Sequence, residues 1–209
     1  MKKITFALPK GRLAEQTMEL LAKIGITCKE MNENSRKLLF VDDKQQYSFF
    51  LAKPTDVPTY VEYGAADIGV VGKDILMEVR RSVTEVAILP YQKCKIVVAG
   101  APNALEQYKN GGHIRVGTSF PNIAIDYFKS IKRNVEVIKL NGSVELGAIV
   151  GLADVVVDLT STGSTLKENG LVIFEEICEV SPRVIVNNAA MKLENERISD
   201  IVKKLVANL

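Results

Sequence analysis

The chain has 209 residues, of which 47% are hydrophobic, and a formal net charge of +2. This length supports one large domain or two small ones with real cores. The basic residues are scattered and leave no electrostatic footprint for nucleic acid. No run approaches the roughly 20 apolar residues that span a bilayer, and the apolar run near the N-terminus, about five residues, is too short for a secretory signal. We therefore expect a soluble, cytoplasmic protein that binds neither nucleic acid nor a membrane.

Apolar runs alternate with amphipathic stretches along the chain. The pattern predicts strands over 4–8, 38–41, 47–51, 67–71, 83–89, 95–99, 114–117, 135–140, 155–159 and 184–186. It predicts helices over 13–24, 57–63, 74–80, 123–132, 144–150, 166–169 and 189–209. This alternation is typical of an α/β fold with mostly parallel sheets flanked by helices.

Two residue types restrict the possible chemistry. The cysteines Cys28, Cys94 and Cys178 are odd in number and far apart, which indicates a reduced setting. His113 is the only histidine and lies in a glycine-containing loop, so zinc sites with several histidines and serine–histidine relays elsewhere in the chain are not expected. If the protein is an enzyme, it acts by positioning and electrostatics.

One sequence pattern occurs twice. Residues 64–70, GAADIGV, match residues 151–157, GLADVVV, and each copy follows a predicted helix and opens a predicted strand. The repeat suggests two similar lobes, residues 1–92 with 179–209 and residues 93–178. Two lobes joined by two crossings leave a cleft, which is the usual place for a small ligand. A chance match of common residues is the alternative.

Lys10, Gly11 and Arg12 follow the first predicted strand, at the edge where open α/β sheets bind ligands. Two cations beside a glycine suit an anionic ligand. The structural alternative is a helix N-terminus whose charges are incidental. Cations are unfavourable beside the positive end of a helix dipole, however, and this favours a functional role for Lys10 and Arg12. Further on, Lys129, Lys132 and Arg133 form the densest basic run, at a predicted helix C-terminus where the dipole accounts for them.

The stretch 158–170, DLTSTGSTLKENG, ends a buried strand in an acid and six small residues. Hydroxyls, free backbone N–H groups and a glycine before a helix make a place for an anion, most often a phosphate. An ordinary strand–helix turn with Thr and Ser caps explains the same residues, and spacing alone does not separate the two. Ser143 is predicted to cap the N-terminus of the helix over 144–150, and Glu145 lies in the first turn of that helix. The P-loop and dinucleotide-binding signatures are absent from the sequence.

Taken together, these residues resemble the short form of ATP phosphoribosyltransferase, the first enzyme of histidine biosynthesis. The most specific part is 151–166, which is similar to the family's phosphoribosyl pyrophosphate loop, and the match runs through nearly the whole chain. Supporting segments are 10–13, 56–58, 66–69, 118–121 and 141–145.

The resemblance implies a fold like that of periplasmic binding proteins and a Mg²⁺-dependent reaction between ATP and phosphoribosyl pyrophosphate. It implies that Asp158 and Glu145 accept hydrogen bonds from the ribose hydroxyls, and that Arg12 and Arg36 bind ATP or pyrophosphate, with Lys10 and Gly11 beside them. The ribose 5-phosphate would be held by Thr160, Ser161, Thr162, Gly163, Ser164 and Thr165.

The resemblance also implies a homodimer within a hetero-oligomer, together with a regulatory subunit similar to histidyl-tRNA synthetase. Longer family members carry their own regulatory domain, and the sequence ends at Leu209, where they continue. The rival hypothesis is a two-lobed ligand-binding module of the same shape that performs no catalysis.

Overall fold

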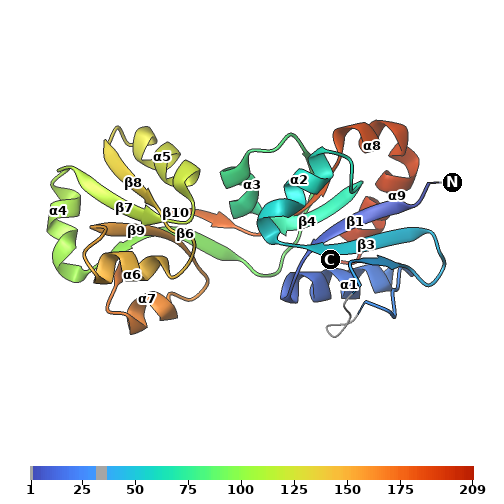
Figure 1. The fold of residues 1–209 in the computed structure, drawn as a ribbon, viewed down its shortest axis with the longest axis horizontal. Helices are drawn as coiled ribbons and strands as arrows, with labels where there is room; N and C mark the ends of the chain where they lie inside the picture. Colours follow the sequence, from blue (N-terminus) through green and yellow to red (C-terminus); the bar gives the residue numbers. More distant parts are fainter. Residues whose placement is uncertain (1, 32–36) are drawn as a thin grey trace. The chain divides into compact units, whose positions relative to one another are not determined.

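A computed structural model describes residues 2–31 and 37–209. The described residues form two compact units. The first unit holds the residues up to Gln92 together with Ser181–Leu209, and the second holds Lys93–Val180. Each unit has its own sheet and its own helices (Figure 1), so the α/β class predicted from the sequence is confirmed.

The first unit contains a six-stranded sheet in the order β2-β3-β1-β4-β11-β5. Its strands are β1 (Ile4–Pro9), β2 (Leu39–Val41), β3 (Tyr47–Ala52), β4 (Ile68–Gly72), β5 (Thr84–Ile88) and β11 (Pro182–Val186). Its helices are α1 (Arg12–Lys23), α2 (Val57–Glu62), α3 (Lys73–Val79), α8 (Asn188–Leu193) and α9 (Asn195–Ala207), with a 3₁₀ turn at Pro54–Asp56.

Alternation along β1 divides the core of the first unit into two layers. Phe6 and Leu8 pack with apolar side chains of α1 and α9 on one face of the sheet. Ala7 points to the other face and packs with α2 and α3. Figure 1 shows α1 on the opposite side of the sheet from α2 and α3. Successive side chains of a strand face opposite ways, so β1 serves both layers.

The second unit contains a five-stranded sheet in the order β10-β6-β9-β7-β8. Its strands are β6 (Cys94–Gly100), β7 (Ile114–Thr118), β8 (Val135–Lys139), β9 (Val155–Thr160) and β10 (Val172–Val180). Its helices are α4 (Leu105–Lys109), α5 (Pro121–Ser130), α6 (Val144–Ile149) and α7 (Ser164–Glu168), with a 3₁₀ turn at Pro102–Ala104. Helices α6 and α7 share one core layer, and Figure 1 shows α5 across the sheet from them.

Both sheets are mixed, which corrects the expectation of mostly parallel sheets. In the first unit β3, β1 and β4 run parallel, whereas β11 is antiparallel to β4 and to β5. In the second unit β8, β7 and β9 run parallel, whereas β6 is antiparallel to β9 and to β10. The chain leaves the first unit after β5 and returns to it at β11. The outgoing and returning strands therefore run in opposite directions, as β5 and β11 do in the first unit and β6 and β10 do in the second.

The two units repeat one topology, so the expectation of two similar lobes is confirmed. The order β3-β1-β4-β11-β5 corresponds to β8-β7-β9-β6-β10, with the same strand directions. The repeated aspartates hold equivalent positions: the Asp67 carboxylate accepts from the backbone N–H of Thr5 at 2.9 Å, and that of Asp154 accepts from Arg115 at 2.8 Å. Each aspartate therefore ties the start of one parallel strand to its neighbour.

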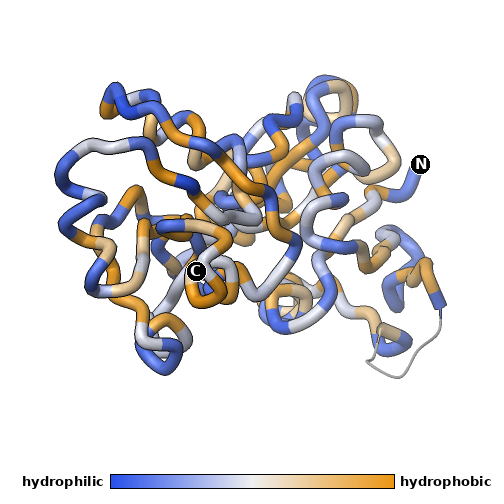
Figure 2. Tube along the Cα trace, turned by 60° about the vertical axis from the view of Figure 1, so that its left-hand side comes forward, coloured by the Kyte–Doolittle hydropathy of each residue, from blue (hydrophilic) through white to orange (hydrophobic). Residues whose placement is uncertain are grey.

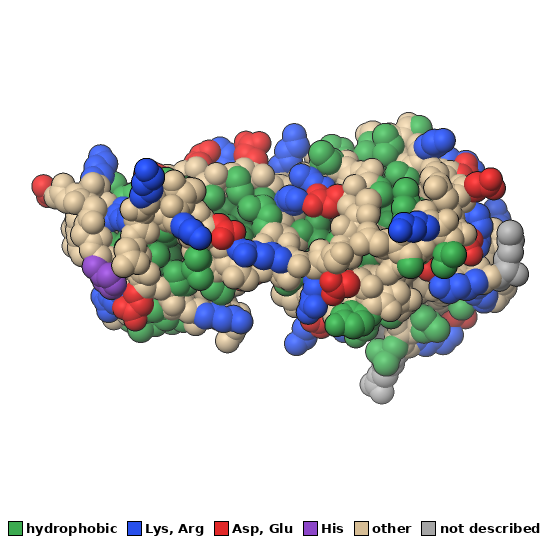
Figure 3. Space-filling view, turned by 90° about the horizontal axis from the view of Figure 1, so that it is seen from above, with side chains coloured by type: hydrophobic (Ala, Val, Ile, Leu, Met, Phe, Trp, Pro, Cys, Tyr) green, Lys and Arg blue, Asp and Glu red, His purple; other side chains and the backbone are tan. Residues whose placement is uncertain are grey.

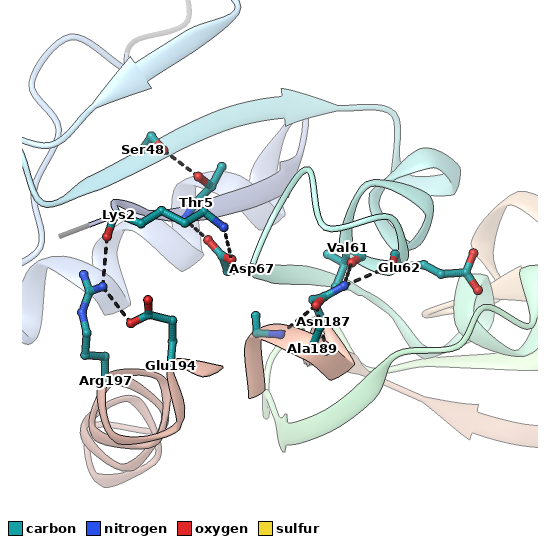
Figure 4. A network of polar contacts seen from close by, with 11 residues as sticks. Lys2, Thr5, Ser48, Val61, Glu62, Asp67, Asn187, Ala189, Glu194 and Arg197 are labelled. Carbon is teal, nitrogen blue, oxygen red and sulfur yellow. Dashed lines mark hydrogen bonds and ion pairs between the residues drawn. The ribbon is translucent and has the colours of Figure 1, made fainter. Parts of the chain in front are cut away.

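Asn187 attaches the returning segment to the first unit (Figure 4). Its side-chain Nδ2 donates to the carbonyls of Val61 (2.7 Å) and Glu62 (3.0 Å) at the end of α2. Its Oδ1 accepts from the first backbone N–H groups of α8. This buried amide therefore satisfies two helix ends at once.

The C-terminal segment forms two helices where the sequence predicts one over 189–209. The break falls at Glu194, whose φ of −118° and ψ of 29° are not helical. Arg197 then donates to the Glu194 carboxylate and to the carbonyl of Lys2, both at 3.0 Å (Figure 4). The change of direction lets Ile198, Ile201 and Leu205 reach the core of the first unit.

Two elements of the second unit were not predicted, namely β10 and α4. Strand β10 carries three glutamates and is mostly exposed at the edge of the sheet, so it lacks the apolar run that marks a buried strand. Hydrophobic and hydrophilic stretches alternate along the rest of the trace (Figure 2). Within the described ranges, no helix has the length and apolarity needed to cross a membrane.

Candidate active site

Three loops of the second unit meet at one edge of its sheet. Strands β8, β7 and β9 are parallel neighbours, with Thr118 of β7 paired to Lys139 of β8 and to Val157 of β9. Their C-terminal ends therefore lie at the same edge, where open α/β sheets bind ligands. The segments 118–121, 140–144 and 160–164 leave the sheet there. The topology thus brings together three segments that are distant in the sequence.

The turn between β9 and α7 is built from hydroxyl groups and one glycine. The backbone N–H of Gly163 donates to Thr160 Oγ1 at 2.8 Å, and Thr162 Oγ1 donates to Ser164 Oγ at 3.0 Å. Gly163 has a φ of 77°, in the left-handed region that favours glycine. Three of the hydroxyls are therefore used inside the turn, as an ordinary structural turn would use them.

The remaining polar groups of the turn face solvent. Ser161 and Thr165 are exposed, and their hydroxyls make no hydrogen bond to any other described residue. Helix α7 is capped by Gly163 without a side-chain bond, in place of the Thr or Ser cap of the structural alternative. Because the first intrahelical bond is from Lys167 to Gly163, the N–H groups of Thr165 and Leu166 have no acceptor within the helix. Donors are thus available to an anion.

Two carboxylates lie beside this turn. Asp158 is half-buried near the end of β9, and burial raises its pKa, with the negative charge of Glu145 adding to the rise. Its Oδ1 accepts from the backbone N–H of Leu159 at 2.8 Å, which opposes the rise. Glu145 belongs to the first turn of α6, near enough for its charge to act on Asp158. Two acceptors at this edge suit a pair of neighbouring hydroxyl groups.

Ser143 precedes α6 as predicted, but it makes no side-chain capping bond. Its φ of 43° and ψ of 51° place a residue other than glycine in the left-handed region. Ser143 therefore occupies the predicted N-cap position, but its side chain does not perform the capping role. Strain of this kind is often found at ligand-binding sites.

Thr118 is a residue that sequence reasoning did not select by itself. It is fully buried, its Oγ1 donates to the carbonyl of Val157 at 2.7 Å, and the same oxygen accepts from the N–H of Phe120 at 2.9 Å. One hydroxyl thus joins the ends of β7 and β9 and shapes the loop before α5. Its sequence signals are its place at the end of an apolar strand, three residues before Pro121, and its membership of the segment 118–121 that supports the family resemblance.

Lys10, Gly11 and Arg12 belong to the first unit. Gly11 has a φ of 97° and a ψ of −159°, and Arg12 is the first residue of α1. Both cations are exposed, and neither forms an ion pair with another described residue. Strands β3, β1 and β4 are parallel, so this loop lies at the C-terminal edge of their sheet. Arg36 lies outside the described residues.

The other chemically active residues do not gather into a site. In the described part of the chain, no group of three or more His, Cys, Asp or Glu is arranged to hold a metal ion. His113 is exposed, and its purple side chain stands at the surface in Figure 3. Asp154 is held by Arg115, whose hydrogen bonds lower the pKa of the Asp154 carboxyl. Its role is therefore structural.

The fold and this edge define an α/β protein of two similar units with a hydroxyl-lined, anion-compatible turn. Comparisons with known proteins specify the family. The ATP phosphoribosyltransferase profile matches residues 53–207. The ATP phosphoribosyltransferase of Lachnoclostridium phytofermentans is 56% identical over 98% of this chain and 96% of its own length. That of Lachnospira eligens is 54% identical over 97% of this chain and 94% of its own length.

Solved structures agree with the sequence comparisons. A chain of the ATP phosphoribosyl transferase (HisG:HisZ) complex from Thermotoga maritima matches with a TM-score of 0.83 and 36% identity, over 98% of both chains. The periplasmic aliphatic sulphonate binding protein of Escherichia coli matches with a TM-score of 0.65 and 9% identity, over 100% of this chain and 72% of its own, which shows a shared fold. The chain belongs to the ATP phosphoribosyltransferase family, pentosyltransferases of the first step of histidine biosynthesis.

Proposed function

We propose that the protein transfers the 5-phosphoribosyl group of phosphoribosyl pyrophosphate to N1 of ATP, releasing pyrophosphate. The N1 lone pair forms the new bond to C1 of the ribose, and pyrophosphate leaves with the electrons of the broken C1–O bond. The observation that carries the proposal is the shared edge of β8, β7 and β9, which holds both the hydroxyl-lined turn and two carboxylates. Family membership supports the same reaction.

The turn over 160–165 would hold the ribose 5-phosphate. Its exposed hydroxyls at Ser161 and Thr165, and the free N–H groups at the start of α7, offer several donors to phosphate oxygens. The internal bonds at Thr160, Thr162, Gly163 and Ser164 would keep those donors in place before the ligand arrives. The turn is therefore both structural and ligand-binding in this proposal.

Asp158 and Glu145 would accept hydrogen bonds from the ribose hydroxyls. A carboxylate accepts such bonds best when ionised. Burial raises the pKa of Asp158, and hydrogen bonds from ribose hydroxyls would offset that rise by stabilising the ionised form. Thr118 would act as a positioning residue, because it fixes the neighbouring loop without facing the ligand.

No strong general base is required, because the attacking nitrogen already carries a lone pair. The main demand is to stabilise a highly charged leaving group, which cations supply. We assign Arg12 and Arg36 to ATP or to departing pyrophosphate, with Lys10 and Gly11 in the same loop as Arg12. The absence of ion pairs at Lys10 and Arg12 with described residues supports their availability to an anion.

Mg²⁺ would be carried mainly by the substrate phosphates. The described residues offer no three-carboxylate cage, and Mg²⁺ is typically bound through one or two carboxylates together with substrate phosphates and water. Asp158 and Glu145 are the acids close enough to one another to assist. When bound, the ion would neutralise charge on the leaving pyrophosphate.

We also propose that this chain works as a homodimer with a regulatory subunit similar to histidyl-tRNA synthetase. The relatives it matches are about as short as this chain, which covers 93–96% of their length. The matching Thermotoga maritima structure is a HisG:HisZ complex.

The decisive experiment mixes the protein with ATP, phosphoribosyl pyrophosphate and Mg²⁺ and follows the ultraviolet absorbance of phosphoribosyl-ATP. We expect product only when all three are present, with one pyrophosphate released per product. A ligand-binding module of the same fold would bind phosphoribosyl pyrophosphate in a titration but release no pyrophosphate. That result, obtained with and without the candidate regulatory subunit, would refute the catalytic assignment.

A further inference from the structure

The densest basic run of the chain lines a pocket in the second unit. Lys129, Lys132 and Arg133 surround a cavity of about 400 Å³ whose wall also includes Asn134 and the apolar side chain of Ile125. None of the described residues that line it is acidic. The pocket lies between the end of α5 and the start of β8, at the edge where the parallel strands begin. The 160–165 turn lies at the opposite edge, so the pocket is a separate place.

The cations of this pocket lack an ion-pair partner among the described residues. Neither lysine nor Arg133 forms an ion pair with another described residue. The Arg133 guanidinium instead lies over the Tyr108 ring, 4.3 Å from its centroid, and its Nε and Nη2 are buried without a hydrogen-bond partner in the described structure. Glu175 accepts from the hydroxyls of Tyr108 and Tyr127. An unpartnered buried donor is costly and calls for an acceptor.

The first unit provides an internal control for this cluster. Helices α1 and α5 follow equivalent strands, β1 and β7, and both end with backbone bonds that reach three and five residues back. In the first unit, Gly25 and Ile26 make these bonds; in the second, Lys132 and Arg133 make them. The fold therefore needs no cation at this helix end.

Lys132 also occupies a backbone conformation that suits glycine. Its φ is 56°, and Gly25 at the equivalent position has a φ of 82°. A left-handed residue after a helix is usually glycine, and lysine there is strained. A strained residue other than glycine, aimed at a basic pocket, points to a role other than stability.

We propose that this pocket binds a phosphate-bearing small anion, outside the site that we assign to the reaction. Lysines serve as point charges for phosphate, and a multivalent oxyanion would meet several cations at once. Its source is either a free phosphate ion, including pyrophosphate, or the phosphate of a nucleotide.

Amide chemical shifts of the ¹⁵N-labelled protein test the proposal directly. Inorganic phosphate, pyrophosphate and AMP are titrated separately at constant ionic strength, and residues 128–135 are read apart from 160–165. We expect saturable shifts at 128–135 with at least one probe. Stronger binding of AMP than of pyrophosphate would assign the site to a nucleotide, and the reverse order to a free phosphate ion.

Lys132→Gly is the informative variant, because it removes a charge and relieves the backbone. Its melting temperature should equal or exceed that of the wild type, while anion affinity at 128–135 falls about tenfold or more, as expected for one charge-assisted bond. The response of 160–165 should not change, so the two sites are judged independently. Lys192→Gln, an exposed lysine of α8, is the charge-matched control.

Two results would overturn the proposal. One is the lack of a saturable shift at 128–135 with all three probes. The other is a Lys132→Gly protein that folds normally and binds the anion as tightly as the wild type. Neither result depends on whether the protein makes phosphoribosyl-ATP.

Discussion

Thr165 illustrates what one hydroxyl contributes at the proposed phosphate site. Its side chain is exposed and makes no hydrogen bond to another described residue, so replacing it should leave the fold intact. We expect Thr165→Val to weaken binding of phosphoribosyl pyrophosphate by about 10- to 150-fold, the loss of one charged hydrogen bond. ATP affinity should stay constant, and isothermal titration measures both. Thr165→Ser, which keeps the hydroxyl, should restore affinity; unchanged affinity in the valine variant would contradict the assignment.

Asp158 and Asp154 lie four residues apart and should respond oppositely to neutralisation. The pKa of Asp158 is raised above 3.8 by burial, so its ionised form destabilises the fold once the pH exceeds that raised pKa. The pKa of Asp154 is lowered by Arg115, so its ionised form contributes stability that is present above 3.8 and lost as the pH falls through the lowered pKa.

Asp158→Asn should therefore raise the melting temperature at pH 7, and Asp154→Asn should lower it. Asp158→Asn should also weaken phosphoribosyl pyrophosphate binding by roughly tenfold or more, because a ribose hydroxyl loses a charged acceptor. Thermal unfolding at pH 7, together with a ligand titration, provides both measurements. A drop in melting temperature for Asp158→Asn would show that its carboxylate is structural.

Arg12 is expected to bind phosphate oxygens with its planar guanidinium. Lysine keeps the charge but cannot make two parallel hydrogen bonds, so Arg12→Lys should lower kcat/KM by about tenfold. The steady-state product assay measures this change. Wild-type kinetics in the lysine variant would make Arg12 an ordinary surface residue.

At the scale of secondary-structure elements, the loop between β1 and α1 depends on the conformation of Gly11. A Cβ at Gly11 would meet nothing within 4 Å, so the cost of a side chain is one of backbone dihedrals alone. Its φ of 97° and ψ of −159° lie in a region essentially restricted to glycine. We expect Gly11→Ala to reduce the free energy of unfolding by about 1–3 kcal/mol.

Gly112→Ala is the matched control for that change. A Cβ there also meets nothing within 4 Å, and Gly112 is not among the glycines with positive φ. Urea denaturation of both variants should show a loss for Gly11→Ala only. Equal stabilities would mean that the loop relaxes into a conformation open to other residues.

Feedback by histidine belongs to the scale of the whole assembly. We propose that a second chain senses histidine, so the isolated chain should be inhibited poorly and the reconstituted mixture strongly. Coupling needs a second site whose ligand distinguishes two states of the enzyme. Turnover across a histidine titration, with and without the regulatory subunit, measures it. Strong saturable inhibition of the isolated chain, non-competitive with both substrates, would show that it carries its own sensor.

Local patterns in the sequence determined the α/β class, most element positions and the repeated unit. They succeed because apolar periodicity and turn residues act over a few neighbouring positions. The repeat at 64–70 and 151–157 could be recognised in the sequence because each copy keeps an aspartate, Asp67 or Asp154, that accepts a backbone hydrogen bond from the neighbouring strand. The turn over 160–165 was a candidate site because hydroxyl residues and a glycine between a strand and a helix can bind an anion.

Only the tertiary structure decided what depends on contacts between distant segments. Strand direction is set by pairing partners, so the antiparallel β11 and β6 and the charged edge strand β10 had no local signal. The break at Glu194 follows from the packing of α9 on the first unit. Thr118 acquires its role only because β7 lies next to β9 in the sheet. Lys132 is unusual only by comparison with Gly25, the residue at the equivalent position of the first unit. Sequence neighbours carry propensity, whereas hydrogen-bond partners and shared edges exist only once the chain has folded.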